Sequence, residues 1–223
     1  MQTLDTVQLI ALAGALGWAS GLRLYLVVLL TGLAGYLGWV DLPLGLRPLA
    51  HPVVLVGSGF MVTVEFFADK VPGLDSLWDM VHTVIRIPAG AALAAGVFGA
   101  DSASMGLLAA LMGGSLAATS HVAKATSRAA INTSPEPFTN IGASLLEDGA
   151  VPLGLWLAVM HPWVFAALLV VMVIASIWLT RLCWRYVRSL LTRLARIFSG
   201  RPDPGALPAF RLTKRAPGDT PHV

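Results

Sequence analysis

Long apolar stretches, separated by short connections rich in Pro and Gly, dominate the pattern of hydrophobic and polar positions along the chain. A helix needs about 20 mainly apolar residues to cross a bilayer, and clusters of Pro and Gly mark the connections between helices. On this basis the predicted spans cover residues 24–40, 51–69, 75–99, 104–131, 138–160 and 163–180. The pattern therefore predicts an all-α integral membrane protein with about six transmembrane helices.

The first apolar run, residues 7–40, is too long for one simple span. The segment Gly17-Trp-Ala-Ser-Gly21-Leu-Arg23 interrupts it. We therefore predict a short re-entrant or interfacial helix ahead of the span at residues 24–40, and the pattern does not decide between these two forms. Because the N-terminus lacks a basic segment and a convincing cleavage site, we expect no cleaved signal peptide.

Composition and charge strengthen the membrane prediction and orient the chain. Of 223 residues, 56% are hydrophobic and 12% are charged, against about 25% charged in an ordinary soluble domain. Residues 1–180 carry six Lys and Arg against ten Asp and Glu, whereas residues 181–223 carry nine against two. Basic residues concentrate on the cytoplasmic side of membrane proteins, so we expect both termini of a six-span chain in the cytoplasm. No segment indicates a nucleic-acid-binding module.

The chain divides into three predicted parts. Residues 1–180 form the transmembrane domain, residues 181–199 a basic amphipathic helix, and residues 200–223 a disordered cytoplasmic tail rich in Pro, Gly and polar residues. The middle part places arginines close to a helical repeat, at Arg181, Arg185, Arg188 and Arg196. Such a helix lies at the membrane surface, where it contacts anionic lipids. Cys183 is the sole cysteine, which excludes an intrachain disulfide.

Two of the predicted spans carry polar side chains along a single helical face. Residues separated by three, four, seven or eleven positions share one face of a helix. In the span at residues 75–99, such positions are held by Asp75, Asp79, His82 and Arg86. In the span at residues 104–131, they are held by His121, Lys124, Arg128 and, just beyond it, Asn132. The sequence therefore predicts a polar stripe that contains both acids (called the acidic stripe) and a basic stripe near the same membrane surface.

The two stripes and the acids around them form the candidate substrate or ion site. Its predicted members are Glu65, Asp69, Asp75, Asp79, His82, Arg86, His121, Lys124, Arg128, Asn132, Glu136, Glu147 and Asp148. Charged groups within spans usually pair with one another, so buried ion pairs that fix helix register are one interpretation. The density of charge in one half of the membrane favours a second interpretation, a water-accessible vestibule open to the cytoplasm.

The residue types suit two kinds of ligand. Carboxylate oxygens with an imidazole suit a divalent cation or a proton relay. The candidate metal ligands are Glu65, Asp69, Asp75, Asp79 and His82. Arg86, Lys124 and Arg128 can instead clamp an anionic headgroup or phosphate, or act as counter-charges. A divalent cation is the one cofactor that the sequence suggests. The glycines, such as Gly113 and Gly114, are interpreted as close helix contacts.

Three functions remain open at this point. The leading hypothesis is a permease or transporter that moves a cation, a proton-coupled solute or an anionic lipid headgroup. The first alternative is a non-transporting scaffold or assembly factor whose stripes dock a partner, and a homo-oligomer is compatible with either function. A lipid-phosphate enzyme is third. A membrane phosphatase combines basic clamps with a His nucleophile oriented by Asp, and the sequence lacks the S-G-H and H-x-x-x-D patterns, so no catalytic residue is assigned.

Several long motifs carry a resemblance to a known family. They are G-W-A-S-G-L-x-L-Y at residues 17–25, V-E-F-F-A-D-K-V-P-G-L-D-S-L-W-D-x-V-H-T-x-I-R at 64–86, S-H-x-A-K at 120–124 and N-T-S-P-E-P-F-T-N at 132–140. Over roughly residues 10–160 the chain resembles the small bacterial membrane proteins grouped as domain of unknown function 4126. The resemblance implies a multi-pass protein of the bacterial inner (plasma) membrane and no established activity. The chain departs from the family at Arg23, where Asn is usual, so that position receives no role.

Overall fold

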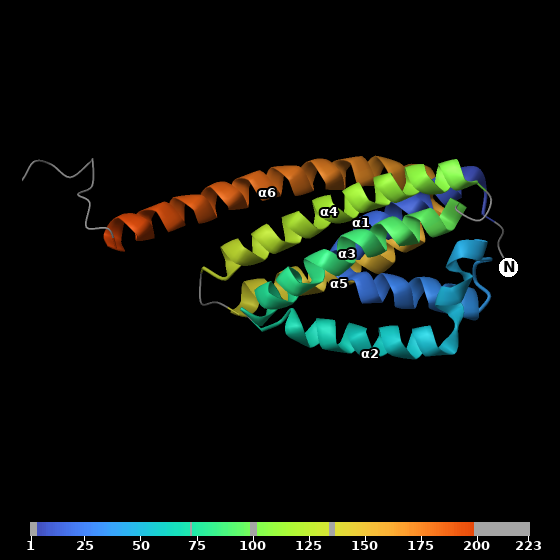
Figure 1. Cartoon of the computed structure of the whole chain (residues 1–223), viewed down its shortest axis with the longest axis horizontal. Helices are drawn as coiled ribbons and strands as arrows, with labels where there is room; N and C mark the ends of the chain where they lie inside the picture. Colours follow the sequence, from blue (N-terminus) through green and yellow to red (C-terminus); the bar gives the residue numbers. More distant parts are fainter. Residues whose placement is uncertain (1–3, 72, 99–101, 134–136, 199–223) are drawn as a thin grey trace, which may run out of the picture. The chain divides into compact units, whose positions relative to one another are not determined.

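The computed structural model of the chain describes residues 4–71, 73–98, 102–133 and 137–198, and for residues 137 and 193–198 only the backbone. Its regular elements are helices (Figure 1). They are α1 (Thr6–Tyr36), the 3-10 helix η1 (Leu44–Ala50), α2 (Pro52–Ala68), α3 (Leu74–Phe98), α4 (Ala103–Ile131), α5 (Pro137–Met160) and α6 (Pro162–Phe198). Residues up to 187 form one compact unit, and α6 continues from there into a second.

Length and composition make this an all-α integral membrane protein. Among the described residues, five helices are long and apolar enough to cross a membrane. The number rises to six when η1 and α2, which meet at a bend of 69°, count as one span. Gly73, between α2 and α3, has a φ of 85°, a conformation that glycine adopts at little cost, and it forms part of the predicted turn. The predicted fold class is therefore confirmed.

Helix α1 forms the centre of the bundle. It contacts α2, α3, α4, α5 and η1, and every residue from 11 to 24 is buried. Asp5 caps its start, because the Asp5 side chain accepts the Gln8 backbone N–H at 2.8 Å while the Gln8 side chain accepts that of Asp5. The Gln8 amide also donates to the carbonyl of Val159 at 2.7 Å, which ties the start of α1 to the end of α5.

Helix α1 is broken at Arg23, whose φ of −142° and ψ of 74° are not helical. The break falls at the boundary that the sequence predicts, just before Leu24. Residues 11–24 of the segment that was predicted to be re-entrant or interfacial are buried by protein. Side chains of α4 bond to backbone near the break: Lys124 Nζ donates to the Leu22 carbonyl at 3.0 Å, and Ser120 Oγ to that of Trp18 at 2.7 Å.

Small residues allow α1, α3 and α4 to approach closely beside this break. A Cβ added to Gly17 of α1 would lie 2.5 Å from the Cα of Gly113 in α4. One added to Gly21 would overlap the Ser120 hydroxyl and the Ala117 carbonyl. Small residues at a contact between membrane helices let the two backbones approach closely. The interpretation of Gly113 as a close helix contact is therefore confirmed.

We expect Gly21→Ala to destabilise the protein by about 1–3 kcal/mol, because the added methyl group overpacks the contact between α1 and α4. Gly57→Ala is the matched control, since nothing lies within 4 Å of a Cβ at that position of α2. Thermal unfolding of the two variants in detergent, followed by circular dichroism, measures the difference. Equal melting temperatures for the two variants would contradict the packing argument.

Helix α6 joins two of the predicted parts of the chain. It runs without a break from Pro162 to Phe198, through the predicted boundary at residues 180 and 181. Arg181, Arg185 and Arg188 are exposed on it. The position of residues 181–199 at the membrane surface stays a prediction. The side chain of Arg196 and the whole of the predicted disordered tail lie outside the described residues.

Candidate functional site

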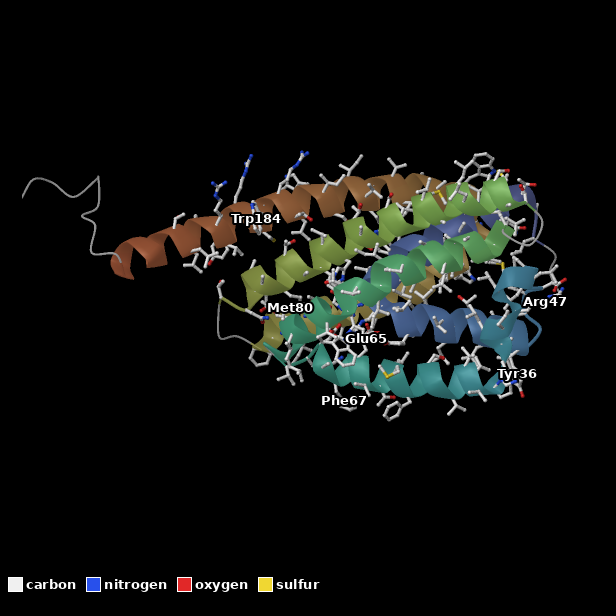
Figure 2. The ribbon with its side chains drawn as sticks, viewed as in Figure 1. Tyr36, Arg47, Glu65, Phe67, Met80 and Trp184 are labelled. Atoms are coloured by element: carbon white, nitrogen blue, oxygen red, sulfur yellow. The ribbon has the colours of Figure 1, made fainter. Side chains whose placement is uncertain are left out.

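The predicted polar stripes meet inside the bundle, next to the break in α1. Helix α2 supplies Glu65, and its C-cap residue is Asp69, while α3 and α4 supply the two stripes and α5 supplies Glu147 and Asp148. Two positions on α2 illustrate the orientation (Figure 2): Glu65 is 1% exposed and faces the interior, whereas Phe67 is 64% exposed and faces outward. Amphipathic placement on each helix therefore brings charges from α2, α3, α4 and α5 into one buried network.

Arg86 joins α3 to α2 at the inner end of this network. Its guanidinium donates to Glu65 Oε1 at 2.6 Å and to Asp79 Oδ1 at 2.6 Å. All three side chains are buried. Arg86 therefore pairs with two carboxylates at once, one from its own helix and one from α2.

Lys124 of α4 lies at the centre of the network. Its Nζ is 2.6 Å from Asp69 Oδ2, 3.2 Å from Glu147 Oε2 and 3.6 Å from Asp79 Oδ1. It also donates to the Leu22 carbonyl at the break in α1. One ammonium group thus links carboxylates from α2, α3 and α5 to the backbone of α1.

Arg23, at the break itself, is the most important residue that sequence reasoning missed. Its NH1 lies 2.8 Å from Asp69 Oδ2, and its NH2 lies 2.9 Å from Asp148 Oδ1 and 2.7 Å from the hydroxyl of Ser144. The side chain is almost fully buried. A lone cation inside an apolar run was the available signal, because such charges in spans are usually functional or paired.

Lys70 lies at the outer edge of the network, in the turn after α2. Its Nζ is 3.7 Å from Asp148 Oδ2 and 3.0 Å from the ring centroid of Phe66. The side chain is 19% exposed and that of Asp148 is 24% exposed. Partial burial lowers the pKa of Lys70 from its ordinary value, and the neighbouring Asp148 carboxylate acts in the opposite direction.

Arg128 connects the network to the start of α3 through asparagine side chains. It donates to the backbone and side-chain oxygens of Asn140 and lies 3.2 Å from Glu147 Oε1. The Asn140 amide donates to Asp75 Oδ2 at 3.0 Å, and the Asn132 amide to Asp75 Oδ1 at 2.8 Å. Asn140 is thus a second site residue that the sequence did not reveal. Its contacts depend on the placement of α5 beside α4.

Asp75 has a structural role that differs from the other acids. It lies within the first turn of α3 and accepts the backbone N–H groups of Gly73 at 2.9 Å and Ser76 at 2.6 Å. No ion pair to it occurs among the described residues. Carboxylates favour the N-terminus of a helix, so Asp75 stabilises the start of α3. Glu136, another predicted site residue, lies outside the described residues.

The two histidines contact polar groups inside the bundle. Nδ1 of His82 lies 2.9 Å from the carbonyl of Trp78 and therefore donates, and Nε2 lies 3.1 Å from the Tyr25 hydroxyl. In His121, Nδ1 lies 3.4 Å from the Arg86 guanidinium and Nε2 lies 2.7 Å from the Thr83 hydroxyl. Tyr25 and Thr83 join the site through these contacts.

The expected water-filled vestibule is wrong for the centre of the site. The acidic and basic stripes contact each other directly, and the side chains of Asp69, Asp79, Arg86, Lys124 and Arg128 are all buried. Exposure rises only toward Glu147, Asp148 and Lys70. The alternative interpretation, buried ion pairs between helices, is what the structure contains, because opposite charges on neighbouring helices are within reach of one another.

A count of charge distinguishes this network from a set of simple ion pairs. Among the described residues it holds five cations and six carboxylates, one of which, Asp75, is bonded by amide groups rather than by a cation. The carboxylates are Glu65, Asp69, Asp75, Asp79, Glu147 and Asp148, and the cations are Arg23, Lys70, Arg86, Lys124 and Arg128. The buried carboxylate oxygens that receive no hydrogen bond from the described protein are Glu65 Oε2, Asp69 Oδ1, Asp79 Oδ2, Glu147 Oε2 and Asp148 Oδ2, and the guanidinium Nε atoms of Arg23, Arg86 and Arg128 likewise donate none. Buried polar atoms are normally bonded, so both acceptors and donors of this network lack a protein partner.

The geometry gives no support to the metal hypothesis. Across the described ranges, no three His, Cys, Asp or Glu side chains converge in a way that could hold a metal ion. Glu65, Asp69 and Asp79 each bond a cationic side chain instead. Arg86, Lys124 and Arg128 likewise face carboxylates of the same protein rather than an open anion site.

The fold and site together define a polytopic helical membrane protein built around a buried ionic network. The chain belongs to the family described as Domain of unknown function (DUF4126), whose model matches residues 10–182. That range contains every member of the network, Arg23 included. No curated protein and no solved structure matches the chain.

Proposed function

We propose that this protein is a membrane transporter that moves protons through its buried carboxylates. The observation that carries the proposal is the network with more carboxylates than cations, in which Glu65, Asp69 and Asp79 each keep one unbonded buried oxygen. Chains of ionisable residues inside membrane proteins typically serve proton or ion movement. A network that served register alone would gain nothing from an unmatched carboxylate.

The order of the charges supports a path from the edge of the network to its interior. Asp148, at the partly exposed edge, contacts Arg23, and Arg23 contacts Asp69. Lys124 links Asp69 to Asp79, and Arg86 links Asp79 to Glu65. Each cation therefore lies between two carboxylates. When one carboxylate takes a proton, its cation can bind the other more closely, so protonation changes the pairing along the series.

The break in α1 supports the same function. Transporters commonly place discontinuous helices at their sites, where released backbone groups line the path. Here the Leu22 carbonyl, next to the break, accepts a hydrogen bond from Lys124. Loss of that bond and movement of Lys124 between Asp69, Glu147 and Asp79 would link proton uptake to the geometry of α1.

Proton flux into liposomes tests this function. Purified protein is reconstituted around a pH-sensitive dye, and a potassium gradient with valinomycin imposes an inside-negative potential. We expect wild-type vesicles to acidify faster than empty ones, and Glu65→Gln and Asp79→Asn each to lose most of that flux. Each variant leaves Arg86 one carboxylate partner, so the bundle is retained.

Asp41→Asn is the matched control for these neutralised carboxylates. Asp41 is exposed and lies 3.5 Å from Arg47, outside the network. Its flux is expected to equal that of the wild type. No acidification above empty vesicles by the wild-type protein, or unchanged flux in both network variants, would contradict the proposal.

The alternative of a scaffold that docks a partner on its polar stripes is less well supported, because both stripes are buried within the protein. The lipid-phosphate enzyme gains no support either, since the basic side chains are engaged by carboxylates. Contact of the basic helix at residues 181–199 with anionic lipids, both termini in the cytoplasm and location in a bacterial inner membrane remain parts of the proposal.

A further inference from the structure

The ionic network has a partly exposed edge, formed by Glu147 and Asp148 of α5 and by Lys70, the residue after the C-cap of α2. The Asp148 side chain is 24% exposed and that of Glu147 is 12% exposed. Behind them, the side chains of Asp69 and Lys124 are fully buried. A group that covers this edge therefore controls how easily water reaches the ions behind it.

The Lys70 side chain joins α2 to α5 across this edge. Its Nζ lies 3.7 Å from Asp148 Oδ2 and donates to the Ser144 hydroxyl at 3.3 Å. On the side of α2, it donates to the Phe66 carbonyl at 3.3 Å and lies 3.0 Å from the centroid of the Phe66 ring. The Ser144 hydroxyl also accepts from Arg23 NH2 at 2.7 Å. Lys70 thus lies on the outer side of a hydroxyl that belongs to the buried network.

Lys70 is held less tightly than the buried cations of the network. A carboxylate oxygen lies 2.6 Å from the cationic nitrogen of Arg86 and of Lys124, and 3.2 Å from that of Arg128. For Lys70 the distance is 3.7 Å, which is beyond the reach of a hydrogen bond. Partly exposed ion pairs contribute little to stability, and the lysine side chain is flexible. Lys70 can therefore leave the network without breaking its buried pairs.

We propose that the Lys70 side chain is a latch, which closes the edge of the network when it lies against Ser144 and Asp148 and opens it when it rotates away. The helices need not move, because the side chain alone makes the contact. In the open state, water reaches Ser144 and Asp148. As a control of access to the site of proton transport, the latch rests on the proposed function. The closing contact itself depends only on the surroundings of Lys70.

The accessibility of a cysteine at position 144 measures the latch. The parent protein for the test is Cys183→Ser/Ser144→Cys, which has a single thiol, in place of the hydroxyl that accepts from Lys70. Purified full-length protein in detergent is treated with a small water-soluble methanethiosulfonate, and mass spectrometry gives the rate of modification. We expect slow modification of the parent, because the side chain at this position is buried.

Three substitutions in the parent test the role of the ammonium group. Lys70→Met should speed modification about fivefold, the largest change expected from a partly exposed ion pair. Lys70→Arg keeps the charge and can still lie on the Phe66 ring, so it should keep modification slow. Arg47→Met removes an exposed cation outside the network and is the matched control. Equal rates in the parent and in Lys70→Met would overturn the proposal.

Ionic strength gives a second test that does not depend on the stability of a variant. High salt screens partly exposed pairs, so it should speed modification of the parent and leave Lys70→Met unchanged. A parent that reacts as fast as the same protein unfolded in dodecyl sulfate, or that does not respond to salt, would also overturn the latch.

Proton flux, measured separately, distinguishes the latch from the transporter. If Lys70 controls modification but wild-type vesicles show no flux, the latch stands and the proposed function fails. If flux is present and Lys70 has no effect on modification, the proposed function stands and the latch fails.

Discussion

Replacement of Lys124 by methionine is expected to destabilise the protein by about 3–5 kcal/mol, because it leaves uncompensated charge in the interior. The Lys124 ammonium lies within 3.6 Å of Asp69, Glu147 and Asp79. Methionine matches much of the aliphatic volume of the side chain, so the change removes the charge more than the packing. It also removes the bond to the Leu22 carbonyl at the break in α1.

Thermal unfolding in detergent and the fraction of monodisperse protein measure this effect. Lys70→Met is the matched control, because Lys70 is partly exposed and contacts Asp148 at 3.7 Å. The double variant Lys124→Met/Asp69→Asn should recover part of the lost stability, since Asp69 is the closest carboxylate at 2.6 Å. A single variant as stable as Lys70→Met would show that Lys124 does not hold these carboxylates together.

Replacement of Arg23 by leucine is expected to have an effect of similar size, again about 3–5 kcal/mol. Asp69 and Asp148 would lose a cation at 2.8 Å and 2.9 Å, and Ser144 would lose its bond from the guanidinium. The guanidinium that is removed belongs to the residue at the break in α1, whose backbone is not helical. The variant should therefore lower the stability of the protein.

Arg47→Leu is the control for this second substitution. Arg47 is an exposed arginine with a single ion pair, 3.5 Å from Asp41, and exposed pairs contribute at most about 1 kcal/mol. Melting temperatures of both variants in the same detergent give the comparison. If Arg23→Leu melts together with Arg47→Leu, the network does not depend on Arg23.

Sequence patterns predicted the helices and the two stripes because both depend on local geometry. The spacing of Asp75, Asp79, His82 and Arg86 places them on one face of any regular helix, and the structure keeps that face buried. The positions of the spans follow from the length that a bilayer imposes. Neither prediction required knowledge of which helices are neighbours.

The partners of these charges were not predictable in the same way. The roles of Arg23, Asn140 and Ser144 follow from contacts between α1, α4 and α5, and those contacts depend on tertiary packing. The vestibule was expected because the charges looked too dense to pair. The prediction left Arg23 out of the count and could not show that Lys124 contacts three carboxylates at once. It therefore overestimated how much of the charge was unpaired.

The distance in sequence between Arg23 and its partners has a consequence for how the protein is made. Helix α1 leaves the ribosome long before the groups that bond its arginine: Glu65, whose backbone carbonyl accepts from Arg23, comes 42 residues later and Ser144 comes 121 residues later. Until then its arginine is unpaired, at a cost of about 2.5–3.5 kcal/mol for insertion near the bilayer centre. The central helix of the finished bundle therefore enters the membrane before its arginine has all of its partners, and synthesis of α5 completes its environment.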